Sequence, residues 1–176
     1  MKRYHPFLVA LHWILAIAIA LWLFMGANTL SEMSDSDPEK INSLRVHMAV
    51  GIGILLLMLI RLVVRLRSAK LDVINADATR MNRLSTLGHY ALYVVVILMS
   101  VSGIVAAQII GLGDIVFFNS GAPLPEDFHD ILPLAAHHTL SIILVFLIVG
   151  HIFAALYHQF ALKENIFSRV WFGNRK

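Results

Sequence analysis

Four long apolar stretches constrain this chain more than any other feature of its sequence. They cover about residues 7–27, 43–64, 85–110 and 132–159, and each is near or above the ~20 residues that a helix needs to cross a bilayer. Charged residues make up 14% of the chain, against about 25% in a soluble protein. Because spanning backbone must satisfy its own hydrogen bonds, the stretches predict an all-α integral membrane four-helix bundle. We expect residues 1–176 to form a single domain.

The distribution of charge predicts the orientation of this bundle. The predicted middle loop, from Arg61 to Arg83, is rich in arginine and lysine, and both ends of the chain are basic. The other two loops are acidic, with Lys40 and Arg45 as their basic residues. By the positive-inside rule, both termini and the middle loop face the cytoplasm. The net charge of +3 follows from this topology and gives no reason to expect a nucleic-acid partner.

The first stretch could also be interpreted as a signal peptide, because it follows a basic N-terminus. Its apolar run is longer than the roughly 7–15 residues of a signal-peptide core. We therefore expect it to be retained as the first helix of the bundle.

Histidines lie at matched depths in three of the predicted helices. His137 and His151 are fourteen residues apart, close to four helical turns, so both rings leave one helix face at depths about 21 Å apart. His47 lies near the outer end of its helix, and His12 near the cytoplasmic end of the first helix. Depth therefore pairs His47 with His137 and His12 with His151. Two imidazole pairs at two depths are what two haems with bis-histidine ligation require.

The residue one turn after each of these histidines is small, which leaves room for a porphyrin beside the ring. These residues are Ala16, Gly51, Ser141 and Ala155. The residue one turn after His89, His138 or His158 is larger. Cysteine is absent, which excludes iron–sulfur ligation and the covalent attachment of c-type haem. Any haem is then b-type, with histidines as the axial ligands of its iron.

Other interpretations of the histidines remain open. Each imidazole alone could be a hydrogen-bonded packing residue in the interior of the bundle. A metal-transport site usually adds carboxylates or thiolates, and the predicted helix interiors contain no Asp, Glu or Cys. Histidine–methionine ligation through Met48 or Met99 leaves His137 or His151 without a role.

The chain resembles the bacterial cytochrome b561 family, in particular its Escherichia coli di-haem type, over its whole length. The motifs that carry the resemblance are H-W in the first helix, R-V-H-M-A-V-G in the second, H-H early in the fourth, and G-H. The family pattern implies two haem b groups, whose axial ligands fall on His12, His47, His137 and His151. It also implies a multi-pass protein of the bacterial inner membrane that oxidises periplasmic superoxide and reduces ubiquinone, without an obligate protein partner.

Further residues are compatible with this chemistry. Lys40 and Arg45 flank the start of the second helix, where free N–H groups and the helix dipole favour an anion such as superoxide. The same two residues could instead pair with haem propionates. For the quinone we rank His158 first, because it shares the face of His151 and lies about 10 Å nearer the cytoplasm. The other candidates near that surface are Trp13, His89, Tyr93, Tyr157 and Gln159.

Two other functions fit the same predicted helices. The chain could be an electron-transfer subunit that links a periplasmic redox protein to the quinone pool, which predicts a docking surface or an extra domain. It could also be a membrane anchor without a cofactor, which predicts a colourless protein. The predicted outer loops are short and acidic, so we favour a freestanding enzyme.

Overall fold

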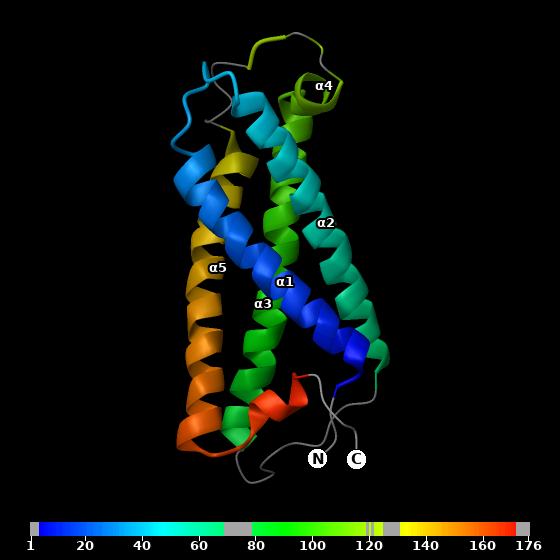
Figure 1. Ribbon diagram of the computed structural model, residues 1–176, viewed down its shortest axis with the longest axis vertical. Helices are drawn as coiled ribbons and strands as arrows, with labels where there is room; N and C mark the ends of the chain where they lie inside the picture. Colours follow the sequence, from blue (N-terminus) through cyan, green and yellow to red (C-terminus); the bar gives the residue numbers. More distant parts are fainter. Residues whose placement is uncertain (1–3, 69–78, 119, 121, 125–130, 172–176) are drawn as a thin grey trace.

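Four long helices form the body of the molecule (Figure 1). The computed structural model describes residues 4–68, 79–118, 120, 122–124 and 131–171. The long helices are α1 (Pro6–Met25), α2 (Lys40–Arg67), α3 (Thr79–Ile109) and α5 (Leu132–Leu156), and the short helix α4 (Leu112–Phe117) precedes α5. In the described part of the chain, all four long helices are apolar and long enough to cross a membrane. The prediction of an all-α membrane four-helix bundle is confirmed.

Local sequence explains where α1 and α5 begin and how they end. Pro6 and Pro133 lie in the first turns of α1 and α5, where the missing N–H of proline leaves no helical hydrogen bond unmade. Each helix then continues into a π-helical turn, over Gly26–Leu30 after α1 and over Tyr157–Ala161 after α5. A 3-10 turn at Ile166–Arg169 follows near the C-terminus.

α2 and α3 are longer than the sequence predicted. The predicted middle loop was wrong at both edges, because α2 runs on to Arg67 and α3 starts at Thr79. Arg61 and Arg65 therefore lie inside a helix, while Lys70 lies outside the described residues. Arginine is a good helix former, and its long side chain can follow apolar surface to reach a polar group. The charges of Arg61 and Arg65 therefore did not indicate where α2 ends.

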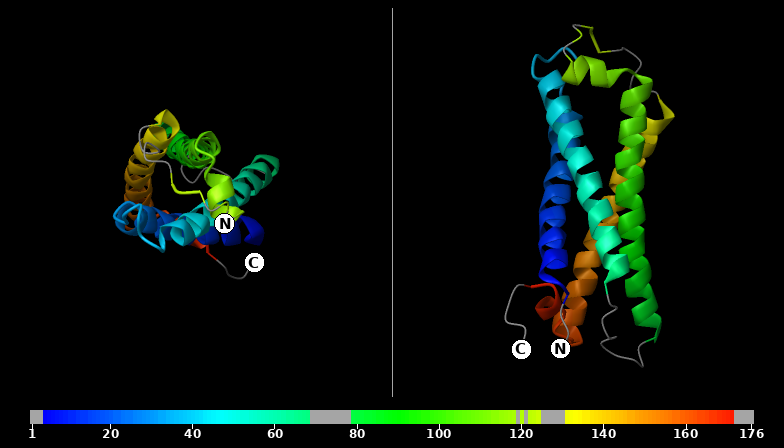
Figure 2. Two further views of the ribbon diagram at one scale, coloured as in Figure 1. Left: turned by 90° about the horizontal axis from the view of Figure 1, so that it is seen from above. Right: turned by 90° about the vertical axis from the view of Figure 1, so that its right-hand side faces the viewer.

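The long helices run alternately up and down and pack as a chain of neighbours. α3 lies along α5, α2 packs on α3, and α1 packs on α2 (Figures 1 and 2). α1 and α2 have almost no close backbone approach to α5. We call the end at which α1 begins and α2 ends the terminal end, and the opposite end the α4 end.

The short helix α4 crosses the α4 end between α2 and α3 (Figure 2). The turn that leads into it depends on Gly111, whose φ of 64° is readily adopted by glycine. Leu112 and Val116 of α4 are buried in a small apolar cluster with Leu44 of α2 and Ala107 of α3. The sequence analysis treated this segment as part of a loop.

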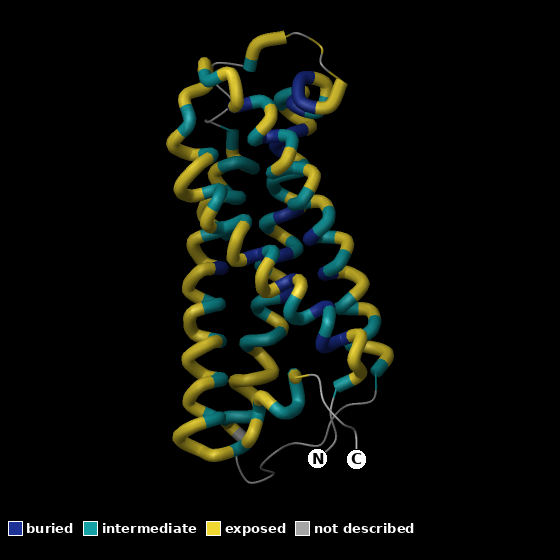
Figure 3. The backbone as a smooth tube through the Cα atoms, in the orientation of Figure 1, coloured by how far each residue is buried: buried dark blue, intermediate teal, exposed yellow. Residues whose placement is uncertain are grey.

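Only a narrow band of each long helix is buried inside the protein (Figure 3). The main core lies near mid-height and includes Leu15, Ile54, Val96 and Leu144. Leu144 is the only buried residue of α5. The outer faces carry exposed large apolar side chains, as expected for helices that face lipid.

Candidate functional site

The four predicted ligand histidines meet as two pairs. The ring centroids of His47 on α2 and His137 on α5 are 6.1 Å apart. Those of His12 on α1 and His151 on α5 are 6.3 Å apart. α5 therefore supplies one ring to each pair, and the partner ring comes from a helix that does not pack closely on α5. The structure brings together the same two pairs that depth matching predicts.

The spacing within each pair fits one metal ion between the two rings. An imidazole nitrogen binds a first-row metal at about 2 Å and lies about 1 Å from its own ring centre. Two rings on opposite sides of one metal therefore have centroids about 6 Å apart. Edge-to-face packing of two rings without a metal gives a similar separation. The surroundings of the rings are therefore needed to distinguish a metal site from ring packing.

The surroundings of His47 fit a ligand in this space. Its Nδ1 is buried and makes no hydrogen bond, which is costly for a polar atom. A Cβ atom on Gly51, one turn further along α2, would meet nothing within 4 Å. The small residue one turn after His47 therefore leaves open space, as the sequence analysis expects. On the other side, the Trp22 indole donates a hydrogen bond to the His47 carbonyl at 3.3 Å and joins α1 to α2.

The ring of His137 is held by α3. Its Nδ1 lies 2.7 Å from the carbonyl oxygen of Met99, and the ring must donate because a carbonyl only accepts. This hydrogen bond leaves Nε2 unprotonated and able to ligate a metal, as in most metal-binding histidines. A Cβ atom on Gly103 would lie 3.0 Å from the same Nδ1, so glycine gives the ring its room.

A third imidazole lies beside the His12–His151 pair. The ring centroid of His89 on α3 is 5.3 Å from that of His151. The Nδ1 of His89 donates to the Ser85 carbonyl at 2.6 Å, so its Nε2 is also unprotonated. The Trp13 ring lies edge to face with that of His12, with 5.4 Å between the centroids. His89, which the sequence analysis placed near the membrane surface, thus belongs to the surroundings of this pair.

The other metal chemistry that the sequence left open is a site for a transported metal ion. Among the described residues, no three His, Asp or Glu side chains are grouped closely enough to hold one ion together. Met48 and Met99, the alternative ligands, are partly buried against the apolar clusters. Each of the two imidazole pairs, with ring planes at 74° and 72°, offers two nitrogen ligands, the number that bis-histidine ligation of one haem requires.

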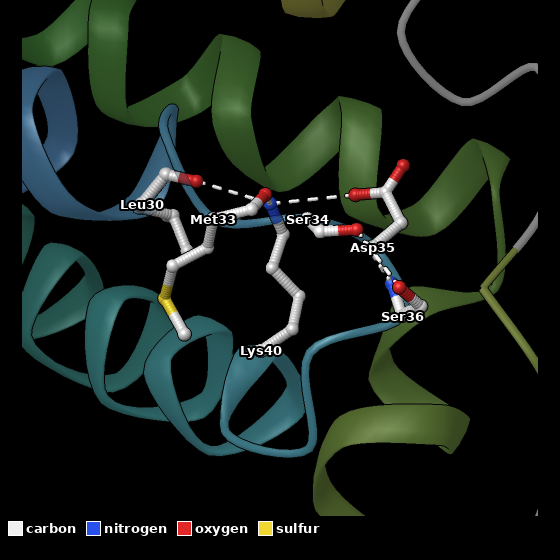
Figure 4. Close-up of polar contacts among 6 residues, drawn as sticks. All are labelled: Leu30, Met33, Ser34, Asp35, Ser36 and Lys40. Carbon is white, nitrogen blue, oxygen red and sulfur yellow. Dashed lines mark hydrogen bonds and ion pairs between the residues drawn. The ribbon is translucent and has the colours of Figure 1, made fainter.

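The two residues predicted to attract an anion are both engaged by the protein. Lys40 is only 4% exposed, and its Nζ donates to the carbonyls of Leu30 and Met33 at 3.0 and 2.8 Å and pairs with Asp35 at 3.3 Å (Figure 4). These contacts tie the α1–α2 connection to the start of α2. Arg45 Nε donates to the Val116 carbonyl of α4 at 2.6 Å. An anion-attracting role for either residue remains a prediction.

At the terminal end, the segment after α5 folds back toward α1. The Trp13 indole donates to the Val170 carbonyl at 2.9 Å, and the Trp13 and Trp171 rings are 5.6 Å apart. His158 pairs with Glu164, with 2.5 Å between Nδ1 and Oε2, and both side chains are 15% exposed. His158, the first-ranked quinone candidate, is thus paired with the Glu164 carboxylate, close to the segment that folds back toward α1.

Sequence reasoning missed three residues around these sites. Glycine at position 103 showed no signal, because its role appears only once α3 is known to face His137. Glu164 follows a π-helical turn that apolar periodicity does not detect. Arg61 had a usable signal, since it follows His47 by the same fourteen residues that separate His137 from His151.

Comparison with known proteins identifies the family to which the chain is similar. The model of the prokaryotic cytochrome b561 family matches residues 3–173. A probable superoxide oxidase of Yersinia pestis is 26% identical over 175 residues, which is 96% of each chain. Cytochrome b561 homolog 1 of Escherichia coli strain K12 is 25% identical over 181 residues, which is 97% of each chain. The similarity therefore extends over all four helices.

Proposed function

Because the chain belongs to the prokaryotic cytochrome b561 family, a family of haem b proteins, we propose that it carries electrons from superoxide to ubiquinone through two haems. The general role, on which this specific one builds, is that of a multi-pass membrane cytochrome b, an oxidoreductase that transfers electrons. The observation that carries the proposal is the presence of two opposed histidine pairs, with ring centroids 6.1 and 6.3 Å apart. Residues 1–176 act in this proposal as one di-haem domain of the bacterial inner membrane.

The histidine pairs hold the two cofactors. His47 and His137 would hold the haem nearer the α4 end, and His12 and His151 would hold the haem nearer the terminal end. When bound, the haems supply one-electron chemistry that joins superoxide oxidation to quinone reduction. Two superoxide ions, one ubiquinone and two protons give two molecules of oxygen and one ubiquinol. The protein fixes the rings, excludes water and provides the proton route.

We place the α4 end outside the cytoplasm, by the positive-inside rule. The Yersinia pestis relative, named a probable superoxide oxidase, supports superoxide as the donor. Arg45 is our first candidate for attracting this anion, because it lies two residues before His47 and holds α4 across the same end. Lys40 contributes its charge from a buried position beside Asp35.

The quinone binds near the terminal end in this proposal. Quinone reduction needs groups that hydrogen-bond the carbonyls and a supply of protons, and histidine is suited to both. The pair formed by His158 and Glu164 joins an imidazole to a carboxylate at the membrane surface, which suits proton delivery. Two further polar groups are available in this proposal: the His89 ring, 5.3 Å from that of His151, and the buried hydroxyl of Tyr93.

His158 can be tested separately from the donor side. We expect His158→Ala to slow ubiquinol formation while superoxide still reduces the haems at the wild-type rate. Stopped-flow spectra of the haem bands and extraction of ubiquinol give the two rates from one reaction. His138→Ala, on another face of α5, is the control. Wild-type ubiquinol formation by His158→Ala would remove His158 from the proton and quinone path.

The alternative function is an electron-transfer subunit that takes electrons from a periplasmic redox protein. Purified protein should be mixed with ubiquinone and a source of superoxide, with and without added superoxide dismutase. Our proposal predicts haem reduction and ubiquinol formation that the dismutase abolishes. Haems that dithionite reduces but superoxide does not would favour the electron-transfer subunit.

A further inference from the structure

Arg61 occupies a position on α2 that repeats the histidine spacing of α5. It follows His47 by fourteen residues, close to four helical turns, so both side chains leave the same face of α2. α2 and α5 run in the same direction (Figure 1). α2 therefore presents an imidazole opposite His137 and a guanidinium at about the level of His151.

The contacts of Arg61 place its charge at the His12–His151 pair. Its Nη1 donates to the Leu8 carbonyl of α1 at 2.6 Å. Leu8 lies one helical turn before His12, so this hydrogen bond joins α2 to the turn that carries the ligand. The guanidinium is also close enough to interact electrostatically with His12, His89 and His151.

The positive charge of Arg61 would be stabilised by a nearby anion. The residue is half-buried within a membrane-spanning helix, where an ionised side chain is costly and usually marks a functional site. In the part of the chain that the structure describes, no carboxylate pairs with it. Its neighbours are instead the Leu8 carbonyl and Tyr93, whose hydroxyl is buried.

We propose that Arg61 is the positioning residue of the haem held by His12 and His151, an inference that rests on the proposed function. Its guanidinium pairs with the carboxylate substituents of that haem and raises its reduction potential. Reduction of ferric to ferrous iron adds one negative charge, and a nearby cation in a low-dielectric interior favours that state. Arg61 thus increases the fraction of the haem at the terminal end that is in the reduced state at a given potential.

The test is a potentiometric titration of the haem bands in four forms of the full-length protein. These forms are the wild type, Arg61→Gln, Arg61→Lys and Arg67→Gln. Arg67 is an exposed arginine at the end of the same helix, so its variant removes the same charge outside the interior. Haem and protein are quantified together in each sample, and the component lost in His12→Ala identifies the relevant haem.

In Arg61→Gln we expect the reduced-to-oxidised ratio of that haem to fall at least tenfold at a fixed potential, which is about 59 mV for one electron. The other haem and Arg67→Gln should titrate as in the wild type, and Arg61→Lys should recover most of the shift. Unchanged potentials in Arg61→Gln with both haems bound would overturn the proposal.

If Arg61→Gln loses the haem, its potential cannot be measured, and the haem content and potential of Arg61→Lys test the proposal instead. Recovery of the haem at near wild-type potential by lysine supports the role of charge. Loss of the haem from the lysine variant as well would show that the fork geometry toward Leu8 matters instead, and would overturn the proposal. A wild-type protein with fewer than two haems would contradict the proposed function itself, a result that is separate from these outcomes.

Discussion

At the scale of single residues, the candidate site depends on groups outside the histidine pairs that contact the imidazole rings and fix their orientation. The Nδ1 of His137 donates to the Met99 carbonyl, and the same edge of the ring lies against the bare Cα of Gly103. His89 is fixed in the same way by the Ser85 carbonyl of its own helix. Such outer contacts set the protonated nitrogen and the direction of the ring, and they are as important to a metal site as the ligands.

Gly103→Val should therefore disturb one site and leave the other intact. The added side chain would press on the His137 ring, which has no room to move without breaking its hydrogen bond to Met99. We expect the variant to lose the haem at His47–His137 and keep the one at His12–His151, as measured by haem content and optical spectra. Gly53→Val is the matched control, because a Cβ atom there meets nothing within 4 Å. Retention of both haems by Gly103→Val would contradict the placement of the site.

Lys40→Met should cost stability. The substitution leaves the carbonyls of Leu30 and Met33 without the Nζ donor of Lys40 and removes the ion pair with Asp35. Leaving the two partly buried carbonyls without a donor costs about 1–3 kcal/mol. We expect a lower thermal midpoint in detergent with two haems retained, and no change for the exposed Lys163→Met. Slower superoxide oxidation at unchanged stability would instead assign Lys40 to the substrate.

At the scale of helices and turns, the apolar stretches predicted the four long helices because membrane backbone has few alternatives. Their ends were predicted less well, since Arg61 and Arg65 continue α2 while their charges were interpreted as loop. The six-residue α4 could not be predicted, because it is stabilised by burial against α2 and α3 rather than by its own periodicity.

In the proposed function, superoxide reaches the α4 end, where Arg45 donates a hydrogen bond to the Val116 carbonyl of α4. We expect Arg45→Ala to slow superoxide oxidation by about two- to tenfold and to flatten its dependence on ionic strength, because a steering charge has been removed. Arg45→Lys should keep most of the rate, although it loses the geometry of the hydrogen bond to Val116. Thermal unfolding of both variants controls for undocking of α4. An unchanged rate in Arg45→Ala with intact haems would remove Arg45 from the substrate path.

At the scale of the whole molecule, α1 and α2 make almost no close backbone approach to α5, and the two histidine pairs join α5 to these helices. The two histidine pairs could be predicted from sequence, because helical rise fixes the depth of each ring and matches His47 with His137 and His12 with His151. The contacts around the pairs could not be predicted in the same way. Those of Gly103, His89 and Arg61 depend on which helix faces which, and depth alone does not contain that information.

The central claim is that each histidine pair holds one haem b. The most direct test is a reduced-minus-oxidised spectrum of the purified protein, with haem and protein quantified in the same sample. The account predicts two b-type haems per chain in the wild type, and the loss of one haem in His12→Ala and of the other in His47→Ala. A wild-type protein with one haem or none, or ligand variants that keep both haems, would contradict it.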